Sequence, residues 1–370
     1  MPFSQHFSYY PGNGKEAFQQ DGAYIFAPST NSSISFNDTI KSTQYFGDIT
    51  NQTQQIINPW ISQTISLSKS QEYIDFTFTI GPIPKEKIDP IAKDIVTTYI
   101  TNIHSQNKFT TDCNGRQTMV RTLNSAPDYI YLNEEPVAGN YYPITTSISL
   151  EDGVNSMACL VDRAEGGSSL KEGALELMVH RRAFADDHLG VEEPLDEEDT
   201  QGNGLIMKGT HRIYIGQKDN IAAITKRHQI ELFNEPILTY APWANKSMAD
   251  YKKSYKSSYE GLANDLPDGV NLLTLETIST SPLIWFMRVE RYIEGGHVKI
   301  GEEPMTVNVA SIFPNFSVKK MVEVNLQGTT FLTDKKKLLK ENKISKYSKN
   351  VDPSLVYLYP MQIRSFYIYL

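Results

Sequence analysis

Residues that could do chemistry are concentrated between positions 160 and 200. This stretch contains the pair Asp162-Arg163, the run Gly166-Gly167-Ser168-Ser169, the run His180-Arg181-Arg182 and the pair Asp186-Asp187. The glycine and serine run lacks the Lys-Ser/Thr pair and the helix start of a phosphate-binding P-loop, which argues against phosphate binding. Because the acidic pair follows the arginines closely, we expect ion pairs that tie a loop to a strand rather than a catalytic pair.

Metal-ligating and nucleophilic patterns are weak. Residues 186–200 contain eight acidic side chains, but their spacing does not match an EF-hand, so a solvated loop is expected rather than a calcium site. No two of the seven histidines lie at metal-ligand spacing, and the sequence contains no Gly-x-Ser-x-Gly nucleophile elbow. Glycoside hydrolysis needs two carboxylates, but the 43 acidic residues offer no way to single out a pair. Taken alone, the residues predict a scaffold without an active site or a metal site.

The composition is that of a globular protein large enough for two domains. Hydrophobic residues make up 40% of the 370 positions and charged residues 21%. The net charge of −8, without a basic stripe, argues against nucleic acid or an anionic membrane as the main partner. No apolar run approaches the roughly 20 residues that span a bilayer. Residues 1–14 lack the pattern of a secretory signal, so we expect either a cytosolic chain or a missing N-terminus.

Most segments that must position these residues have the patterns of strands. Tyr73–Ile80 alternates apolar and polar residues, and Ile95–Ile103 is rich in β-branched residues. Further strands are predicted over 144–150, 157–161, 175–180, 211–215, 271–275, 285–292, 321–326 and 362–369. Residues 248–262 and 334–342 could each hold a short helix, but both lack an apolar stripe and are expected to be solvated connections. The pattern predicts an all-β protein built from antiparallel sandwiches.

A stretch rich in serine, lysine, tyrosine and glycine before residue 266 separates the long first part from a compact, strand-rich end. We therefore predict a large β-sandwich domain over 1–244, a linker over 245–265 and a small β-sandwich domain over 266–370. The first 60 residues are polar with aromatic interruptions, and are expected at an edge of the sheets.

Three further features leave alternatives open. Tyr141 and Tyr142 follow a small-residue turn and could bind a sugar ring, or they could belong to the sandwich core or its rim. Cys113 and Cys159 could form one bridge or remain two buried thiols. The N-glycosylation sequons are close in number to the chance expectation, so they support the secretory pathway only weakly; they lie at Asn31, Asn37, Asn51, Asn245 and Asn315.

Several longer motifs run in a fixed order from residue 22 to the end of the chain. They cover 22–28, 111–116, 136–143, 160–170, 175–195, 266–275 and 361–366. Together they resemble the C-terminal half of the lysosomal-type α-mannosidases, glycoside hydrolase family 38. The resemblance implies a large antiparallel β-sandwich of the galactose-mutarotase-like supersandwich type, followed by a smaller C-terminal β-sandwich.

The resemblance also implies a function. Enzymes of this family hydrolyse terminal α-mannosides of N-glycans with retention, through an aspartate nucleophile and a second acid/base carboxylate. A zinc ion held by two histidines and two aspartates orients the sugar. These groups belong to the family's N-terminal half, and this chain begins beyond it. The resemblance therefore implies a C-terminal fragment that binds no zinc itself, has an N-terminal catalytic half and mannose-containing oligosaccharides as partners, and is lysosomal or secreted.

Few site residues transfer from the family. Tyr142 matches a tyrosine whose hydroxyl reaches the mannose pocket, and Glu276 falls near a position whose backbone carbonyl approaches it. Cys113 stands where the family usually has serine, so no bridge can be inferred. The remaining motif residues are expected to be structural: Asn114, Arg116, Asp162, Arg163, His180, Arg181, Arg182, Asp186 and Asp187. The alternative hypothesis is a freestanding carbohydrate-binding or scaffold protein without catalysis.

Overall fold

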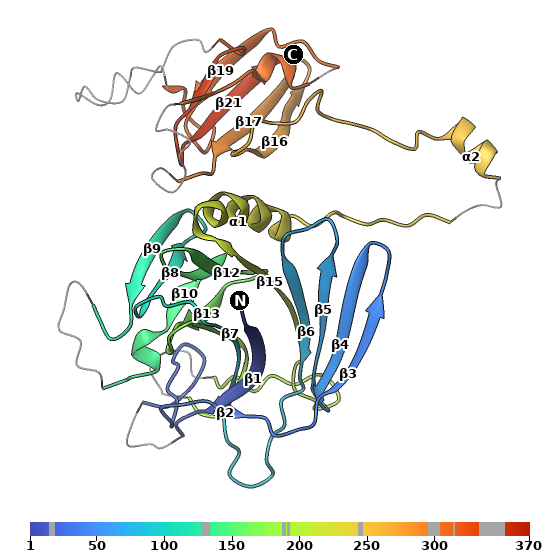
Figure 1. The fold of residues 1–370 in the computed structure, drawn as a ribbon. Coiled ribbons are helices and arrows are strands. Elements are labelled where there is room, and N and C mark those ends of the chain that lie inside the picture. Colours follow the sequence, from blue (N-terminus) through green and yellow to red (C-terminus); the bar gives the residue numbers. More distant parts are fainter. Residues whose placement is uncertain are drawn as a thin grey trace. The chain divides into compact units, whose positions relative to one another are not determined.

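The chain forms two compact units, Met1–Asn234 and Glu235–Leu370, which are considered separately (Figure 1). The computed structural model describes residues 1–14, 19–126, 134–186, 190, 193–242, 247–294, 304–313, 315–332 and 352–370. The domain bounds predicted from the sequence, with a linker over 245–265, stay a prediction.

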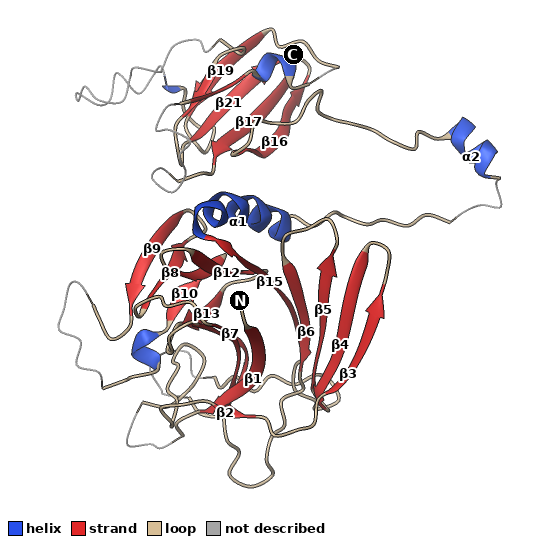
Figure 2. Ribbon diagram, in the orientation of Figure 1, coloured by secondary structure: helices blue, strands red, loops and turns tan. Residues whose placement is uncertain are grey.

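The first unit is built on two antiparallel sheets (Figure 2). In the smaller sheet, six strands follow the order β10 (Tyr142–Ile144), β13 (Glu165–Ser168), β14 (Ala174–Arg182), β7 (Lys93–Thr101), β1 (Phe3–Pro11) and β2 (Ile34–Ser35). In the larger sheet, nine strands follow the order β3 (Lys41–Phe46), β4 (Thr50–Asn58), β5 (Ile61–Ser68), β6 (Ile74–Ile80), β15 (Met207–Gln217), β12 (Asn155–Val161), β11 (Ser147–Glu151), β8 (Lys108–Cys113) and β9 (Gln117–Thr122). Both β2 and β3 are edge strands, as expected for the polar N-terminal region.

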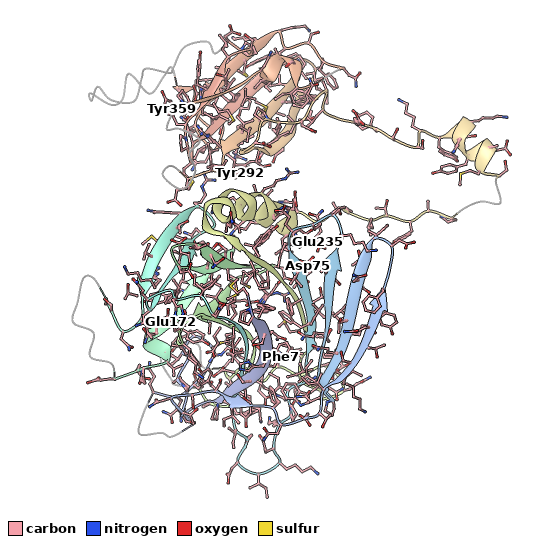
Figure 3. The ribbon with its side chains drawn as sticks, viewed as in Figure 1. Phe7, Asp75, Glu172, Glu235, Tyr292 and Tyr359 are labelled. Carbon is pink, nitrogen blue, oxygen red and sulfur yellow. The ribbon has the colours of Figure 1, made fainter. Side chains whose placement is uncertain are left out.

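The core of this unit lies between the two sheets. Tyr99 and Leu175 from the six-stranded sheet pack in one cluster with Phe76 and Met157 from the nine-stranded sheet. Phe7 from β1 belongs to a second cluster between the sheets (Figure 3). Because alternate residues of each strand point to this interior, the period-two pattern of the sequence is explained. The unit is a β-sandwich.

A helix that the sequence analysis did not predict, α1 (Lys218–Phe233), packs on the nine-stranded sheet. Leu232 joins Ala158, Leu160 and Tyr214 in a small apolar cluster there. The helix also buries the polar Thr225 and Gln229, which weaken its apolar stripe.

The second unit has a four-stranded antiparallel sheet and a two-stranded one. The first has the order β16 (Val270–Thr280), β17 (Leu283–Arg291), β21 (Ile363–Tyr369) and β19 (Lys320–Val324), and the second pairs β18 (Met305–Val307) with β20 (Val356–Leu358). An apolar cluster, which includes Met287, Val356 and Phe366, joins them. The prediction of an all-β fold is confirmed.

Short helical segments complete the description. The 3-10 turns are η1 (Ala138–Asn140) and η2 (Val309–Ser311), and α2 (Met248–Ser254) buries no side chain, as expected for a solvated connection. The other expected connection, 334–342, lies outside the described residues. None of the helices in the described part of the chain is long and apolar enough to cross a membrane.

Candidate functional site

Tyr142, the residue expected to bind sugar, lies on β10 at the edge of the six-stranded sheet, opposite Gly167 on β13. Its half-buried ring makes an edge contact with Phe109 at a centroid distance of 5.8 Å. The guanidinium carbon of Arg121 lies 4.3 Å from the centroid of the same ring. Among the described residues, the Tyr142 hydroxyl has no hydrogen-bond partner. Phe109 and Arg121 therefore fix the position of the Tyr142 ring.

Arg121 is a site residue that the sequence analysis missed. The turn at Asn114 and Gly115, both at positive φ, closes the β8–β9 hairpin and sets a register that pairs Arg121 with Phe109. Arg121 Nε donates to Thr111 Oγ1 at 3.1 Å, which holds the guanidinium in place. The Asn-Gly pair was the signal that could have found it, because that turn alone fixes which residues face each other.

The backbone before Tyr142 is held by buried polar contacts. The Asn140 side-chain amide donates to Asn124 Oδ1 and to the Pro136 carbonyl, and Ser168 Oγ donates to the Asn140 carbonyl at 2.7 Å. Tyr141 Oη donates to Glu176 Oε1 at 2.5 Å. Tyr141 thus anchors the segment in the sheet through Glu176, whereas Tyr142 makes no such bond to a described residue.

Glu176, on β14, is the acceptor that organises this region. Its carboxyl oxygens also accept from Tyr10 Oη at 3.0 Å and from Thr98 Oγ1 at 3.3 Å. Burial raises the pKa of the Glu176 carboxyl, against the opposing effect of these hydroxyl donors and of Tyr141. Glu176 lies within the motif 175–195, but the sequence alone gives it no role, because its partners Tyr10, Thr98 and Tyr141 lie on distant segments.

Asp112 and Asp162 fix neighbouring turns. Asp112 Oδ1 accepts from the amides of Thr145, Thr146 and Ser147 at 2.8–3.0 Å. Asp162 Oδ2 accepts from the Thr210 amide, and its carboxylate pairs with Arg163. These contacts are structural. Arg116 is half-buried beside the Asn114 turn.

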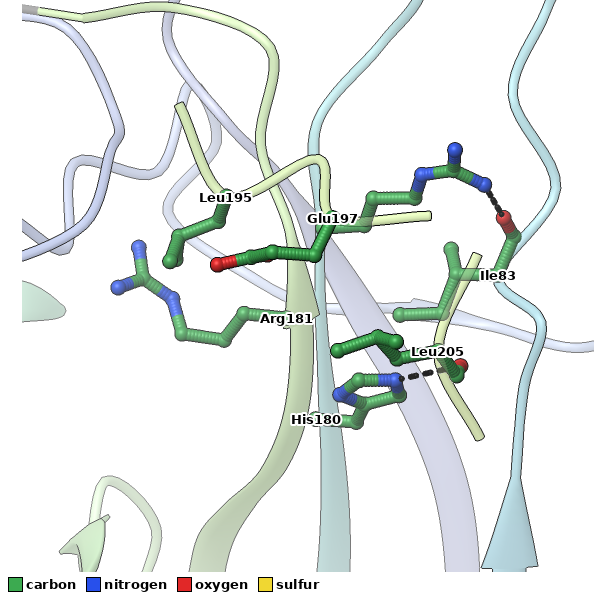
Figure 4. Close-up of a pocket in the computed structure, with 7 residues that line it drawn as sticks. Ile83, His180, Arg181, Leu195, Glu197 and Leu205 are labelled. Atoms are coloured by element: carbon green, nitrogen blue, oxygen red, sulfur yellow. Dashed lines mark hydrogen bonds between the residues drawn. The ribbon is translucent and has the colours of Figure 1, made fainter. Parts of the chain in front are cut away.

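The His180-Arg181-Arg182 run at the end of β14 lies beside a small cavity (Figure 4). Its volume is about 20 Å³, which holds a single water molecule and not a sugar. His180 Nε2 lies 3.2 Å from the Leu205 carbonyl oxygen, and burial lowers its pKa. Arg182 pairs with Asp196 and Glu198, which ties the acidic loop to the strand.

The other expected residues are placed as follows. Arg181 pairs with Asp21 and Asp94, Asp186 is half-buried, and Asp187 lies outside the described residues. Glu276 lies exposed on β16 in the second unit, opposite Phe286. Both cysteines are free thiols; Cys159 is buried as expected, but Cys113 is exposed at the end of β8, where the expectation of a buried thiol is wrong. Of the sequons, Asn31, Asn37 and Asn315 are exposed, Asn51 is half-buried in β4, and Asn245 lies outside the described residues.

Comparisons with known proteins agree with this architecture. The model of the glycosyl hydrolases family 38 C-terminal domain matches residues 2–189. Lysosomal alpha-mannosidase of Mus musculus is 32% identical over 374 residues, which cover 99% of this chain and 36% of the relative. A probable alpha-mannosidase of Arabidopsis thaliana is 31% identical, with coverages of 100% and 38%.

The fold also resembles that of a solved structure. The crystal structure of an alpha-mannosidase from Enterococcus faecalis V583 aligns with a TM-score of 0.63 at 12% identity, over 98% of this chain and 38% of that one. This chain therefore spans little more than a third of the length of the proteins it matches. From the match over half of its residues, the chain belongs to glycoside hydrolase family 38, within the family's C-terminal region.

Proposed function

We propose that this chain is the C-terminal portion of a retaining α-mannosidase that hydrolyses terminal α-D-mannosides of N-glycans. In this proposal the chain supplies a scaffold and one wall of the mannose pocket. The nucleophile and the acid/base carboxylate belong to a catalytic half outside it. The family match and the names of the relatives support the reaction class, and their greater length supports a further half.

The observation that carries the proposal is the geometry of Tyr142. Arg121 lies over its ring, so that face is unavailable for stacking on a pyranose. The hydroxyl, in contrast, has no partner within the described part of the chain and can donate to or accept from a sugar hydroxyl. We therefore assign Tyr142 a hydrogen-bonding role in the pocket, and this polar role fits a wall of a larger site better than an aromatic lectin platform.

In this proposal the chain itself holds no zinc ion. Among the residues that the structure describes, no group of three histidine, cysteine, aspartate or glutamate side chains could hold a metal ion. These residues do not fit the two-histidine, two-aspartate set that the family implies. We assign the ion to the catalytic half, and no step of the proposal passes through it here.

Glu276 and the cellular location are further parts of the proposal. Glu276 is exposed on β16, which pairs on one side only among the described strands, so its outer backbone groups can bond to a neighbouring molecule. A role for its backbone carbonyl at the pocket would use that accessibility. Several relatives are lysosomal alpha-mannosidases, which supports a lysosomal location.

The test is reconstitution. The purified chain, mixed with the N-terminal half of the mouse relative and zinc in acidic buffer, is expected to release p-nitrophenol from p-nitrophenyl α-mannoside, while the chain alone is inactive. In the mixture, Tyr142→Phe is expected to lower kcat/KM about tenfold, because one hydrogen bond to the substrate is lost.

Tyr45→Phe is the matched control, since Tyr45 is an exposed tyrosine on the edge strand β3. It should leave kcat/KM unchanged. Activity of the chain alone would refute the assignment of the nucleophile to another half. If neither the chain alone nor the mixture is active, but methyl α-mannoside still binds to the chain, a freestanding carbohydrate-binding protein would be favoured.

A further inference from the structure

Three charged groups are buried together on the outer side of the six-stranded sheet. Asp94 on β7 and Asp21 in the connection between β1 and β2 are fully buried, and Arg181 on β14 is the cation between them. Arg181 Nε donates to Asp94 Oδ1 at 2.5 Å, and Arg181 Nη2 donates to Asp21 Oδ1 at 2.9 Å. We call these residues the Asp-Arg-Asp cluster.

The cluster attaches loop 19–31 to the sheet. Arg181 also donates to the carbonyl of Gly22 at 2.9 Å and to that of Ile25 at 2.7 Å. Asp21 Oδ1 accepts from the Ala27 amide at 2.8 Å. Arg181 and the Asp21 carboxylate thus fix the loop to the sheet, in addition to backbone bonds from the Asn13 amide to the Ala27 carbonyl and from the Ser29 amide to the Pro11 carbonyl.

The charges of the cluster do not balance. Two carboxylates face one guanidinium, and Asp21 Oδ2 and Asp94 Oδ2 are both buried without a hydrogen-bond partner among the described residues when no proton is placed between them. A proton shared by the two carboxyl groups satisfies both oxygens. Burial and the repulsion of Asp94 raise the pKa of Asp21 to about 7, against the opposing effect of Arg181.

Other titratable groups near the cluster are few. Tyr10 on β1 is the cross-strand neighbour of Asp94, and it donates to Glu176 on β14. Segment 183–186 approaches Gly22 through the Ala185 carbonyl, and Asp186 is the titratable residue on that segment. The Arg181 guanidinium opposes the rise in the pKa of both Asp21 and Asp94.

Loop 19–31 leads to the candidate site through Phe26. The ring of Phe26 packs on Tyr141 at a centroid distance of 4.8 Å and on Tyr10 at 5.7 Å. Tyr141 precedes Tyr142 in the chain and bonds to Glu176. The loop thus packs through Phe26 on the outer side of Tyr141, which is next to Tyr142, the residue assigned to the pocket.

We propose that loop 19–31 is a clamp on the segment Asn140–Tyr142, closed in acid and weakened as the pH rises towards neutrality, with Asp21, Asp94 and Arg181 as its positioning residues. The clamp is a property of this chain alone. Its consequence for sugar binding rests on the proposed function.

The number of protons bound in the closed and open forms decides the direction of the pH effect. Between about pH 4 and pH 7 the closed clamp holds one proton that the open, solvated aspartates do not hold. Raising the pH over this range therefore favours opening, by up to about tenfold in the opening equilibrium for each pH unit. Above about pH 7 the opening equilibrium no longer changes with pH, because both the closed and the open form have then lost the proton.

Hydrogen exchange of the purified full chain tests the clamp. In the wild type, the opening equilibrium of amides in peptides covering 19–31, after correction for intrinsic exchange, is expected to rise steeply between about pH 4 and pH 7. Asp21→Asn places an amide donor where the shared proton lies, so its loop should stay closed with little pH dependence. The β12 peptide, Asn155–Val161, is the internal control for global stability.

Equal pH dependence of the loop in the wild type and in Asp21→Asn, or none in the wild type, would overturn the proposal. If Asp21→Asn does not fold, Asp94→Asn replaces it, since it also removes the extra carboxylate and has the same expectation. In the reconstituted mixture, KM for the mannoside should rise with pH more steeply in the wild type than in the variant. An inactive mixture would count against the proposed function only, because the exchange result decides the clamp.

Discussion

Replacing His211 with leucine is expected to lower the free energy of unfolding of the first unit by about 3–5 kcal/mol, because it leaves a buried carboxylate without its cation. His211 on β15 is fully buried, and its Nε2 lies 3.0 Å from Oε2 of Glu165, whose side chain is 3% exposed. Its Nδ1 lies 3.0 Å from the Tyr99 hydroxyl oxygen. Urea denaturation followed by tryptophan fluorescence measures the loss.

The pair also predicts a pH dependence. Burial alone would lower the pKa of His211, but the Glu165 carboxylate overrides this effect and raises it well above the ordinary value. The contribution of a raised histidine pKa to stability is complete below about pH 6.5 and is lost as the pH rises through the folded-state pKa. The wild-type free energy of unfolding should therefore fall as the pH rises above about 6.5.

A double-mutant cycle gives the control. The variant with leucine at both His211 and Glu165 should recover part of the loss, since no charge is then buried alone. Glu231→Gln, which breaks the pairs that the exposed Glu231 makes with His228 and Arg227 on α1, should cost less than about 1 kcal/mol. Additive effects of the two leucine substitutions would show that the pair does not act as a unit.

The sequence predicts strands well where neighbours along the chain determine them. Tyr73–Ile80 and Trp285–Tyr292 appear as β6 and β17, because their strand-forming residues are visible within each segment itself. The predicted strand 144–150 instead forms two strands in different sheets. The chain bends where the amides of Thr145 and Thr146 donate to Asp112, a partner more than 30 residues away that no local pattern reveals.

In the candidate site, too, contacts between distant segments could not be predicted from the sequence. A motif resemblance pointed to Tyr142, but the residues that hold it come from other strands and are set by register. The sequence also suggested the acidic pair that follows Arg181 as its partner. The partners in the structure, Asp21 and Asp94, are 160 and 87 positions away, because cross-strand pairing and a returning loop decide which charges meet. Proximity in sequence therefore predicted that Arg181 forms ion pairs, but it did not predict which carboxylates are its partners.

Arg364→Met is expected to destabilise the second unit by about 3–5 kcal/mol, the usual cost of breaking a buried ion pair from one side. Arg364 on β21 donates through Nε and Nη2 to the two carboxylate oxygens of Glu323 on β19, at 2.8 and 2.7 Å. It also donates to the Tyr357 carbonyl on β20. One side chain thus joins the two sheets of this unit, and methionine keeps its apolar stem while removing all three bonds.

Urea-dependent hydrogen exchange in peptides of β21 measures the loss, and peptides of β12 in the first unit should not change. Arg227→Met is the matched control, because Arg227 lies in an exposed pair with Glu231, for which a cost below about 0.5 kcal/mol is expected. Arg364→Met combined with Glu323→Leu should be more stable than Arg364→Met alone, since the orphaned carboxylate is then removed. If Arg364→Met alone costs no more than Arg227→Met, the two sheets are held by their apolar contacts and the ion pair only specifies their register.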